Sequence, residues 1–125
     1  MNKESREAWK MTREDIRSGK QKYRIDYRVS AVPGTWVTEY MIDNFAAPIG
    51  SVWWRYVGSG TIDILHSYVM KPLRRCGIRT DIHKAMRFSN PKCTFVSGAA
   101  SGKASRKWMK KMGYKKDIDW TLPPK

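Results

Sequence analysis

Acidic residues and long apolar runs are both scarce in this chain of 125 residues. Eleven Asp and Glu stand against 25 Lys and Arg, which gives a formal net charge of +14 at pH 7. No apolar run approaches the roughly 18 to 20 residues of a membrane span, and the N-terminus lacks the apolar core of a signal peptide. We therefore expect a cytoplasmic protein with no membrane partner. Its charge favours anionic partners and says little about its fold.

Cysteine is scarce as well. Cys76 and Cys93 are too few and too badly spaced for a disulfide framework or a zinc site. We expect two free thiols in a reducing compartment and no metal site. The length lies near the commonest domain size, and 41% hydrophobic residues can supply one core, so residues 1–125 are expected to form a single domain.

Hydrophobic periodicity divides the chain into helices and strands. It predicts a helix lying across a sheet (2–18), then four strands over residues 23–30, 35–42, 49–57 and 61–70. A helix ending near residues 89–91, a strand (93–97), a helix (101–112) and a final strand (114–122) follow. A strand–helix–strand unit after an antiparallel meander predicts an α/β (α+β) fold with a mixed sheet, in which strands 61–70 and 93–97 are parallel.

The most informative segment is YVMKPLRRCGIRT, residues 68–80, which leads from an apolar strand into an amphipathic helix. A helix begins with free backbone N–H groups and the positive end of its dipole, so it stabilises an anion placed there. Gly77 suits a close backbone approach, Arg74, Arg75 and Arg79 supply charge, and Thr80 supplies a hydroxyl. The turn therefore has the composition of a phosphate site. The alternative is an ordinary strand-to-helix turn whose arginines are solvated, which would have the same sequence pattern.

The order of these motifs resembles the GNAT superfamily of acyl-CoA-dependent N-acyltransferases, over about residues 35–122. The family's phosphate loop reads Arg/Gln-x-x-Gly-x-Gly/Ala, and here it reads Arg74-x-x-Gly77-x-Arg79. SGKASRKWMKKMGY, residues 101–114, is similar to the family's second motif, a helix closing on Gly-Phe or Gly-Tyr beside the pantetheine arm. The small size and basic charge are similar in style to phage-encoded members, for which the compartment would be the host cytoplasm.

The resemblance implies acetyl-CoA, or another acyl-CoA, as cofactor. It also implies that the two parallel strands splay apart to admit the pantetheine, and the break in alternation at Ile64-Leu65 fits a β-bulge there. The cofactor-binding residues would be Tyr68, Val69, Arg74, Arg75, Cys76, Gly77, Ile78, Arg79, Thr80 and Ser105. Arg79 stands where the family has a small residue, so it would either crowd the pyrophosphate or add a ligand to it.

Acyl transfer to an amine needs a base for the ammonium proton and stabilisation of the oxyanion and the departing thiolate. Asp63 and His66 on the strand before the turn are the candidate bases, each with an ordinary structural role as the alternative. Met109 occupies the place where many family members carry a tyrosine acid, so Tyr68, Ser105 or a water would have to donate the proton to the thiolate.

The acceptor is expected to be large. Family members place two helices between their first two strands, and Pro33-Gly34 leaves no room for them here. An open acceptor site suits a macromolecule that is anionic or associated with nucleic acid, and the basic residues along 106–116 fit that reading. Two alternatives remain at this point: a phage-type enzyme that modifies nucleic-acid bases on the same fold, and a non-catalytic basic protein that binds nucleic acid or protein.

Overall fold

The computed structural model describes residues 2–98, 103–116 and 118–125. Within these ranges the helices are α1 (Lys3–Ser18), the short 3-10 helix η1 (Lys71–Leu73), α2 (Ile78–Ser89) and α3 (Lys103–Lys111). The strands are β1 (Tyr23–Val29), β2 (Trp36–Ile42), β3 (Gly50–Val57), β4 (Thr61–Val69), β5 (Thr94–Ser97), β6 (Lys115–Lys116) and β7 (Trp120–Leu122).

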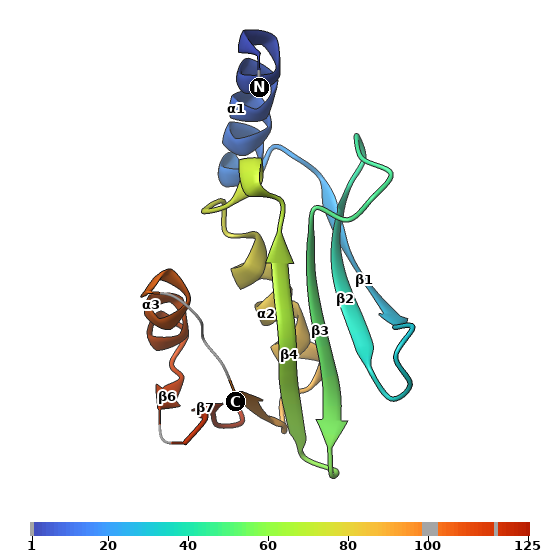
Figure 1. The fold of residues 1–125 in the computed structure, drawn as a ribbon, viewed down its shortest axis with the longest axis vertical. Helices are drawn as coiled ribbons and strands as arrows, with labels where there is room; N and C mark the ends of the chain where they lie inside the picture. Colours follow the sequence, from blue (N-terminus) through green and yellow to red (C-terminus); the bar gives the residue numbers. More distant parts are fainter. Residues whose placement is uncertain (1, 99–102, 117) are drawn as a thin grey trace.

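The strands form one mixed sheet in the order β1-β2-β3-β4-β5-β7-β6. The first four make an antiparallel meander, and β5 then pairs with β4 in parallel, after the chain has crossed through α2. In Figure 1, α2 lies behind β3 and β4, while α3 and the short C-terminal strands lie on the other side of β4 from the meander. The mixed sheet and the parallel pair predicted from the sequence are confirmed.

Strand β4 is irregular in the middle. Trp53 pairs with His66 and Trp54 pairs with Ile64, so the intervening Leu65 forms a bulge. The parallel ladder with β5 ends at the pair Ile64–Ser97, whereas β4 continues to Val69. The predicted bulge is confirmed, and the outer half of β4 extends beyond its parallel partner among the described residues.

The main core lies between α2 and the meander. Ile78, Ile82 and Met86 form the buried stripe of α2, and Gly50 of β3 lies directly beneath its first turn. A Cβ atom on Gly50 would lie 2.6 Å from Ile78 Cγ2. This glycine therefore lets the beginning of α2 come close to the sheet beside the end of β4, which fixes the position of the turn between them.

Two predicted elements need correction. Helix α1 does not lie across the sheet: it stands at one end of it (Figure 1), where it contacts η1 and where Trp9 stacks on Phe45 at 5.3 Å. The single strand predicted over 114–122 is wrong, because β6 and β7 are two short strands that pair with each other. Apolar alternation is lost at the two exposed lysines of β6, and Ile118 is 88% exposed. The predicted start of α3 at residue 101 lies outside the described residues.

Candidate functional site

The turn between β4 and α2 has an unusual backbone. After η1, Arg75 adopts φ 66°, the one positive φ among the non-glycine residues that the structure describes. Gly77 follows at φ 85° and is the N-cap residue of α2. A side chain rarely adopts this left-handed region, and residues held there cluster at functional sites. A Cβ on Gly77 would meet nothing within 4 Å, so Gly77 is needed for its conformation, and the space above it is open.

The beginning of α2 presents backbone donors at this turn. The first N–H that bonds back along the helix is that of Asp81, to Gly77 O at 2.9 Å, and no side chain caps the helix. The preceding N–H groups of α2 thus point toward the turn, where the helix dipole is positive. Arg74 and Arg75 are exposed beside them. This arrangement suits a phosphate or pyrophosphate group.

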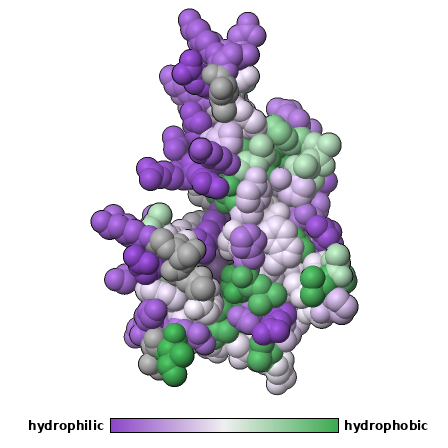
Figure 2. Space-filling model, in the orientation of Figure 1, coloured by the Kyte–Doolittle hydropathy of each residue, from purple (hydrophilic) through white to green (hydrophobic). Residues whose placement is uncertain are grey.

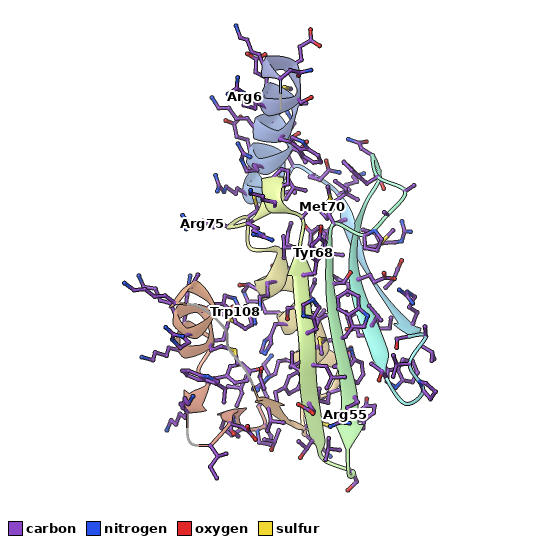
Figure 3. The ribbon with its side chains drawn as sticks, in the orientation of Figure 1. Arg6, Arg55, Tyr68, Met70, Arg75 and Trp108 are labelled. Atoms are coloured by element: carbon purple, nitrogen blue, oxygen red, sulfur yellow. The ribbon has the colours of Figure 1, made fainter. Side chains whose placement is uncertain are left out.

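A cleft of about 620 Å³ opens at this turn. The side chains and backbone that line it come from β4, the turn, the first turn of α2 and α3: His66, Ser67, Tyr68, Val69, Leu73, Arg74, Arg75, Gly77, Ile78, Arg79, Thr80, Ala104, Ser105 and Trp108. Figure 3 labels three of the contributors: Tyr68 on β4, Arg75 projecting from the turn, and Trp108 between α3 and β4. The structure therefore gathers nearly all the residues predicted from the sequence in one cleft.

Asp63 and Cys76 are the exceptions, because neither belongs to the described lining of the cleft. Asp63 lies on the ladder with β5, opposite Val96, and pairs with Arg55 at 3.2 Å. The Cys76 thiol turns into the core and contacts Arg74 O at 3.8 Å. Burial raises the pKa of this thiol, against the lowering effect of Arg17 and Arg13. The structure therefore does not bring the Asp63 carboxylate or the Cys76 thiol to the site.

His66 and Tyr68 project from the same face of β4 next to the bulge. His66 is exposed and its ring lies 5.4 Å from that of Trp53 on β3. Tyr68 is 46% exposed and is paired across the ladder with Ser51. An imidazole that reaches solvent has a ring nitrogen that can accept a proton from an approaching amine. His66 is thus the candidate base that lies in the cleft.

Val69 and Arg74 are joined across the cleft wall. Arg74 Nε donates to Val69 O at 3.2 Å. The carbonyl of Val69, one of the residues that the family resemblance assigns to the cofactor, therefore has a hydrogen-bond partner within the protein. The contact holds the Arg74 side chain along the end of β4.

The far wall of the cleft is built from contacts between α2 and α3. Trp108 Nε1 donates to Thr80 Oγ1 at 2.9 Å, and Arg79 Nη1 donates to Ser105 Oγ at 3.2 Å. The Arg79 guanidinium also lies 4.0 Å from the centre of the Trp108 ring. The sequence alone does not single out Trp108, because its partners lie on another helix. The hydroxyls of Thr80 and Ser105 serve as acceptors within this wall.

Helix α1 contributes to the turn from outside. Arg13 Nη1 donates to Pro72 O at 2.8 Å, and Arg17 Nη2 donates to Arg75 O at 3.2 Å. Both acceptors are main-chain carbonyls of the phosphate turn. Nothing in the local sequence around residues 70–80 could have pointed to these two arginines, which lie almost sixty positions earlier in the chain.

A much smaller cavity of about 10 Å³ adjoins the cleft, and Ser67, Arg79 and Trp108 line both. His83 and Tyr114 lie in this inner cavity, with His83 Nε2 2.7 Å from the Tyr114 hydroxyl. His83 is 4% exposed and its Nδ1 atom has no hydrogen-bond partner. Burial, reinforced by Arg87 and Arg79, lowers the pKa of His83 to about 4, so the ring is neutral near pH 7.

The surface beside the cleft is strongly basic. On α3 and β6 the exposed cations are Lys103, Arg106, Lys107, Lys110, Lys111, Lys115 and Lys116. None of the ion pairs among the described residues involves them. In Figure 2, hydrophilic side chains project from the α1 end and from the α3 side, while paler and apolar residues cover much of the surface between them. The cleft thus opens next to a positively charged rim.

Two other kinds of site find no support in the part of the chain that is described. No group of three His, Cys, Asp or Glu residues there could hold a metal ion. No helix described is long and apolar enough to cross a membrane.

Comparison with known proteins identifies the fold. No family model and no curated protein matches the sequence. Among solved structures, a GNAT family acetyltransferase from Elizabethkingia anophelis with acetyl-CoA bound is 13% identical, with a TM-score of 0.61, over 76% of this chain and 78% of that one. An aminoglycoside N-acetyltransferase, AAC(6')-Iy, in complex with CoA is 20% identical, with a TM-score of 0.56, over 93% and 89%. An IAA acetyltransferase from Bacillus cereus is 14% identical, with a TM-score of 0.54, over 75% and 77%.

These similarities establish that the chain has the GNAT fold, with its mixed sheet and its strand–helix–strand unit. At this level of identity they describe the architecture alone. The chemistry has to be argued from the cleft.

Proposed function

We propose that this protein is an acyl-CoA-dependent N-acyltransferase, with acetyl-CoA as the preferred donor. The observation that carries the proposal is the continuity of the cleft. One end is the phosphate turn with Arg74, Arg75 and Gly77, and the other holds His66 beside the bulge of β4. A ligand with phosphates at one end and a reactive group at the other suits such a cleft, and two of the structural neighbours are described with acetyl-CoA or CoA bound.

The residues present fit such a cofactor. The open space above Gly77 and the free end of α2 accommodate a pyrophosphate, and the two exposed arginines of the turn neutralise its charge. The hydrogen bonds from Arg13 and Arg17 hold the turn in shape before any ligand arrives. Such preorganisation lowers the cost of binding. When bound, the cofactor supplies an activated acyl group as a thioester.

The remaining chemistry falls to side chains of β4. His66 accepts the proton of the incoming ammonium, because its imidazole lies in the cleft, reaches solvent and has a ring nitrogen that can take up a proton. The Tyr68 hydroxyl lies two residues further along the same face and can donate a proton or a hydrogen bond to a group in the cleft. Asp63 takes no part, because Arg55 engages it away from the cleft.

We further propose that the acceptor is a macromolecule with anionic character. The connection from β1 to β2 is a tight hairpin, with Ser30 N–H donating to Thr35 O at 2.9 Å, so no helix covers the meander at this point. The exposed lysines and arginines of α3 and β6 border the cleft. A nucleic acid, or a protein amine held close to one, is attracted by such a rim through its phosphates.

The test is acyl transfer from radiolabelled acetyl-CoA to three acceptors: a lysine-containing basic peptide, an aminoacyl-tRNA and an amine-bearing DNA oligonucleotide. The account predicts label in one of the two nucleic-acid acceptors, lost in a His66→Gln variant that still binds CoA. Transfer to the peptide alone would overturn the proposal that the acceptor is a nucleic acid or a group attached to one. Binding of CoA with no transfer to any acceptor would contradict the proposal that this protein is an enzyme.

A second function is favoured by one observation. Met109, at the position where the family resemblance implies a tyrosine acid, is 1% exposed and belongs to the core. A non-catalytic protein that keeps the fold to bind a polyanion fits that substitution. A phage-type base-modifying enzyme would instead transfer label to an unmodified oligonucleotide, so the assay separates the three functions once that oligonucleotide is added as a fourth acceptor.

A further inference from the structure

Arg79 is the residue that connects the cleft to the inner cavity. It lines both, together with Ser67 and Trp108. Its side chain reaches back from the first turn of α2 to Ser105 and lies against the face of Trp108. The inner cavity lies at Ile64 and Ser97, the last pair of the parallel ladder, and the cleft lies beside the part of β4 that extends beyond that pair. The cation is therefore located where the cleft meets the inner cavity.

The charge of Arg79 is not balanced by an acid in the described structure. The ion pairs found there join Arg24 to Asp26, Arg28 to Glu39 and Arg55 to Asp63. Burial lowers the pKa of Arg79, yet a guanidinium keeps its proton throughout the physiological range. A partly buried cation whose hydrogen bond goes to a neutral hydroxyl has strong capacity left for an anion, since charges interact more strongly where water is excluded.

A second group in the inner cavity points to the same ligand chemistry. Neutral His83 shares one hydrogen bond with Tyr114, and its Nδ1 atom is buried without a partner. If Tyr114 donates to Nε2, the single ring N–H proton of neutral His83 lies on Nδ1. If Nε2 donates instead, the hydroxyl hydrogen of Tyr114 is released. In either tautomer these two residues, which both line the cavity, have one N–H or O–H donor without a hydrogen-bond partner.

We propose that Arg79 and the donor of the His83–Tyr114 pair form an anion-stabilising pocket for the thiolate of the acyl-CoA donor. This rests on the proposed function. Transfer forms the bond from the amine nitrogen to the acyl carbon and breaks the bond from that carbon to sulfur. The ammonium would first give one proton to His66, which frees the lone pair of the amine for attack. The electron pair of the broken bond would go to sulfur, which Arg79 would hold as an anion, and the second proton that the nitrogen loses as the amide forms would pass to water. Release of CoA as a thiol returns one proton from His66 or from water to the sulfur.

The pocket also accounts for Met109. A tyrosine acid protonates a thiolate, whereas a fixed positive charge beside it removes the need for an acid at that position. Met109 lines the inner cavity next to Tyr114, so a tyrosine there would compete for the space that the His83–Tyr114 pair uses. Arg79 and Met109 both differ from the residues that the family pattern has at these positions, and the pocket explains the two differences together.

The test compares the dissociation constants of CoA and desulfo-CoA by calorimetry between pH 6 and pH 9. The two ligands carry the same phosphates, so their ratio isolates the sulfur. The titratable and charged groups that face the two hollows are His66, Arg74, Arg75, Arg79, His83 and Tyr114, with Arg87 acting on His83. The charges of these groups affect the affinities of CoA and desulfo-CoA equally, apart from any contact with the sulfur atom that desulfo-CoA lacks.

An ordinary thiol has a pKa of about 8.5, and a pocket that favours the thiolate tightens CoA binding as the pH rises toward that value. We expect the affinity of CoA relative to desulfo-CoA to rise about tenfold over this range in the wild type, and to stay flat in Arg79→Gln. Arg79→Lys keeps the charge and should keep part of the rise. Arg74→Gln, the control at the phosphate end, should weaken both ligands equally and leave the pH dependence of their ratio intact.

If the ratio of the CoA and desulfo-CoA affinities of the wild type does not change with pH, the proposed thiolate pocket is wrong, whatever the variants show. The proposed function would still hold in that case, provided that both ligands bind. Failure of both ligands to bind would overturn the proposed function itself. A rise in the ratio that survives in Arg79→Gln would show that another group favours the thiolate and would also overturn the assignment. Loss of the rise in His83→Gln, with desulfo-CoA binding unchanged, would support the part assigned to the pair.

Discussion

Arg55 Nη2 lies 3.2 Å from Asp63 Oδ2, and this pair spans β3 and β4 directly below the bulge. The carboxylate is thus engaged by a neighbouring strand and lies outside the described lining of the cleft. On the other side of the bulge, His66 faces the cleft. One inserted residue, Leu65, separates a structural position on β4 from a position available for chemistry.

The first prediction contrasts these two residues. His66→Gln should lower kcat by about 10²- to 10⁴-fold, the usual contribution of a general base, with little change in the affinity for CoA. Asp63→Asn should leave kcat within a factor of about three, because only an exposed ion pair of small energetic value is lost. Steady-state kinetics with the acceptor identified by the labelling assay would decide. Equal losses in both variants would show that the base assignment is wrong.

The second prediction concerns the backbone of the phosphate turn. Gly77→Ala should destabilise the protein by about 1 to 2 kcal/mol, because a Cβ is disfavoured at a left-handed φ, and CoA binding should weaken more than tenfold. Gly34→Ala is a matched control: Gly34 has φ 77° and equally open surroundings, but it lies in the β1–β2 hairpin. It should show a similar loss in urea unfolding with unchanged CoA binding. If CoA binding falls equally in both variants, the turn has no special role.

The third prediction tests the contribution of α1. Arg13→Met removes the hydrogen bond to Pro72 O, which is worth about 1 kcal/mol, so the dissociation constant for CoA should rise about fivefold while kcat holds. Lys10→Met, an exposed position on the same helix, serves as the control and should change neither value. A fall in kcat with unaltered binding in Arg13→Met would argue against a positioning role.

Much of this architecture could be predicted from the sequence because its causes are local. Alternation in β1 and β2, the glycine after the arginines and the helical stripe of Ile78, Ile82 and Met86 each depend on near neighbours in the chain. The break at Ile64-Leu65 marked the bulge for the same reason. The predicted cofactor residues gathered in one cleft because most of them belong to one continuous turn.

The parts that were missed depend on contacts distant in sequence. Trp108 reaches Thr80 across 28 positions, and His83 meets Tyr114 across 31. His83 is buried because Phe95 of β5, Trp108 of α3 and Tyr114 pack around its ring, and all three lie outside α2. The prediction of one strand over 114–122 was wrong because two exposed lysines form β6 by pairing with β7, and hydrophobic periodicity does not predict such a strand.

The fourth prediction follows from the lowered pKa of His83, about 4 in the folded protein. The unfolded chain has a histidine pKa near 6.5 and binds this proton more readily, so stability is complete above about pH 6.5 and falls as the pH drops toward 4. The loss should reach roughly 3 kcal/mol from this residue. Urea unfolding between pH 7 and pH 4 measures it. His83→Gln should flatten the difference, whereas His66→Gln, at an exposed position, should not.

The fifth prediction concerns the basic rim. A Lys110→Glu, Lys111→Glu variant should bind a short DNA duplex more weakly, with a salt dependence reduced by about 0.9 per phosphate contact removed. Both residues are exposed on α3 and outside the described lining of the cleft, so CoA binding should persist. Fluorescence anisotropy at several salt concentrations gives the slopes. If the variant and the wild type show the same dependence of DNA affinity on salt, this surface does not bind nucleic acid through Lys110 and Lys111.

The most direct measurement of the central claim is thermal unfolding with acetyl-CoA, desulfo-CoA, ATP and a DNA duplex at low and moderate salt. A ligand present at 100 times its dissociation constant adds about 2.7 kcal/mol of stability. The account predicts a stabilisation by both CoA compounds that survives moderate salt, exceeds that of ATP and disappears in an Arg74→Gln, Arg75→Gln variant. No response to either CoA compound, together with a strong salt-sensitive response to DNA, would contradict it and leave the phosphate turn as part of a polyanion-binding surface.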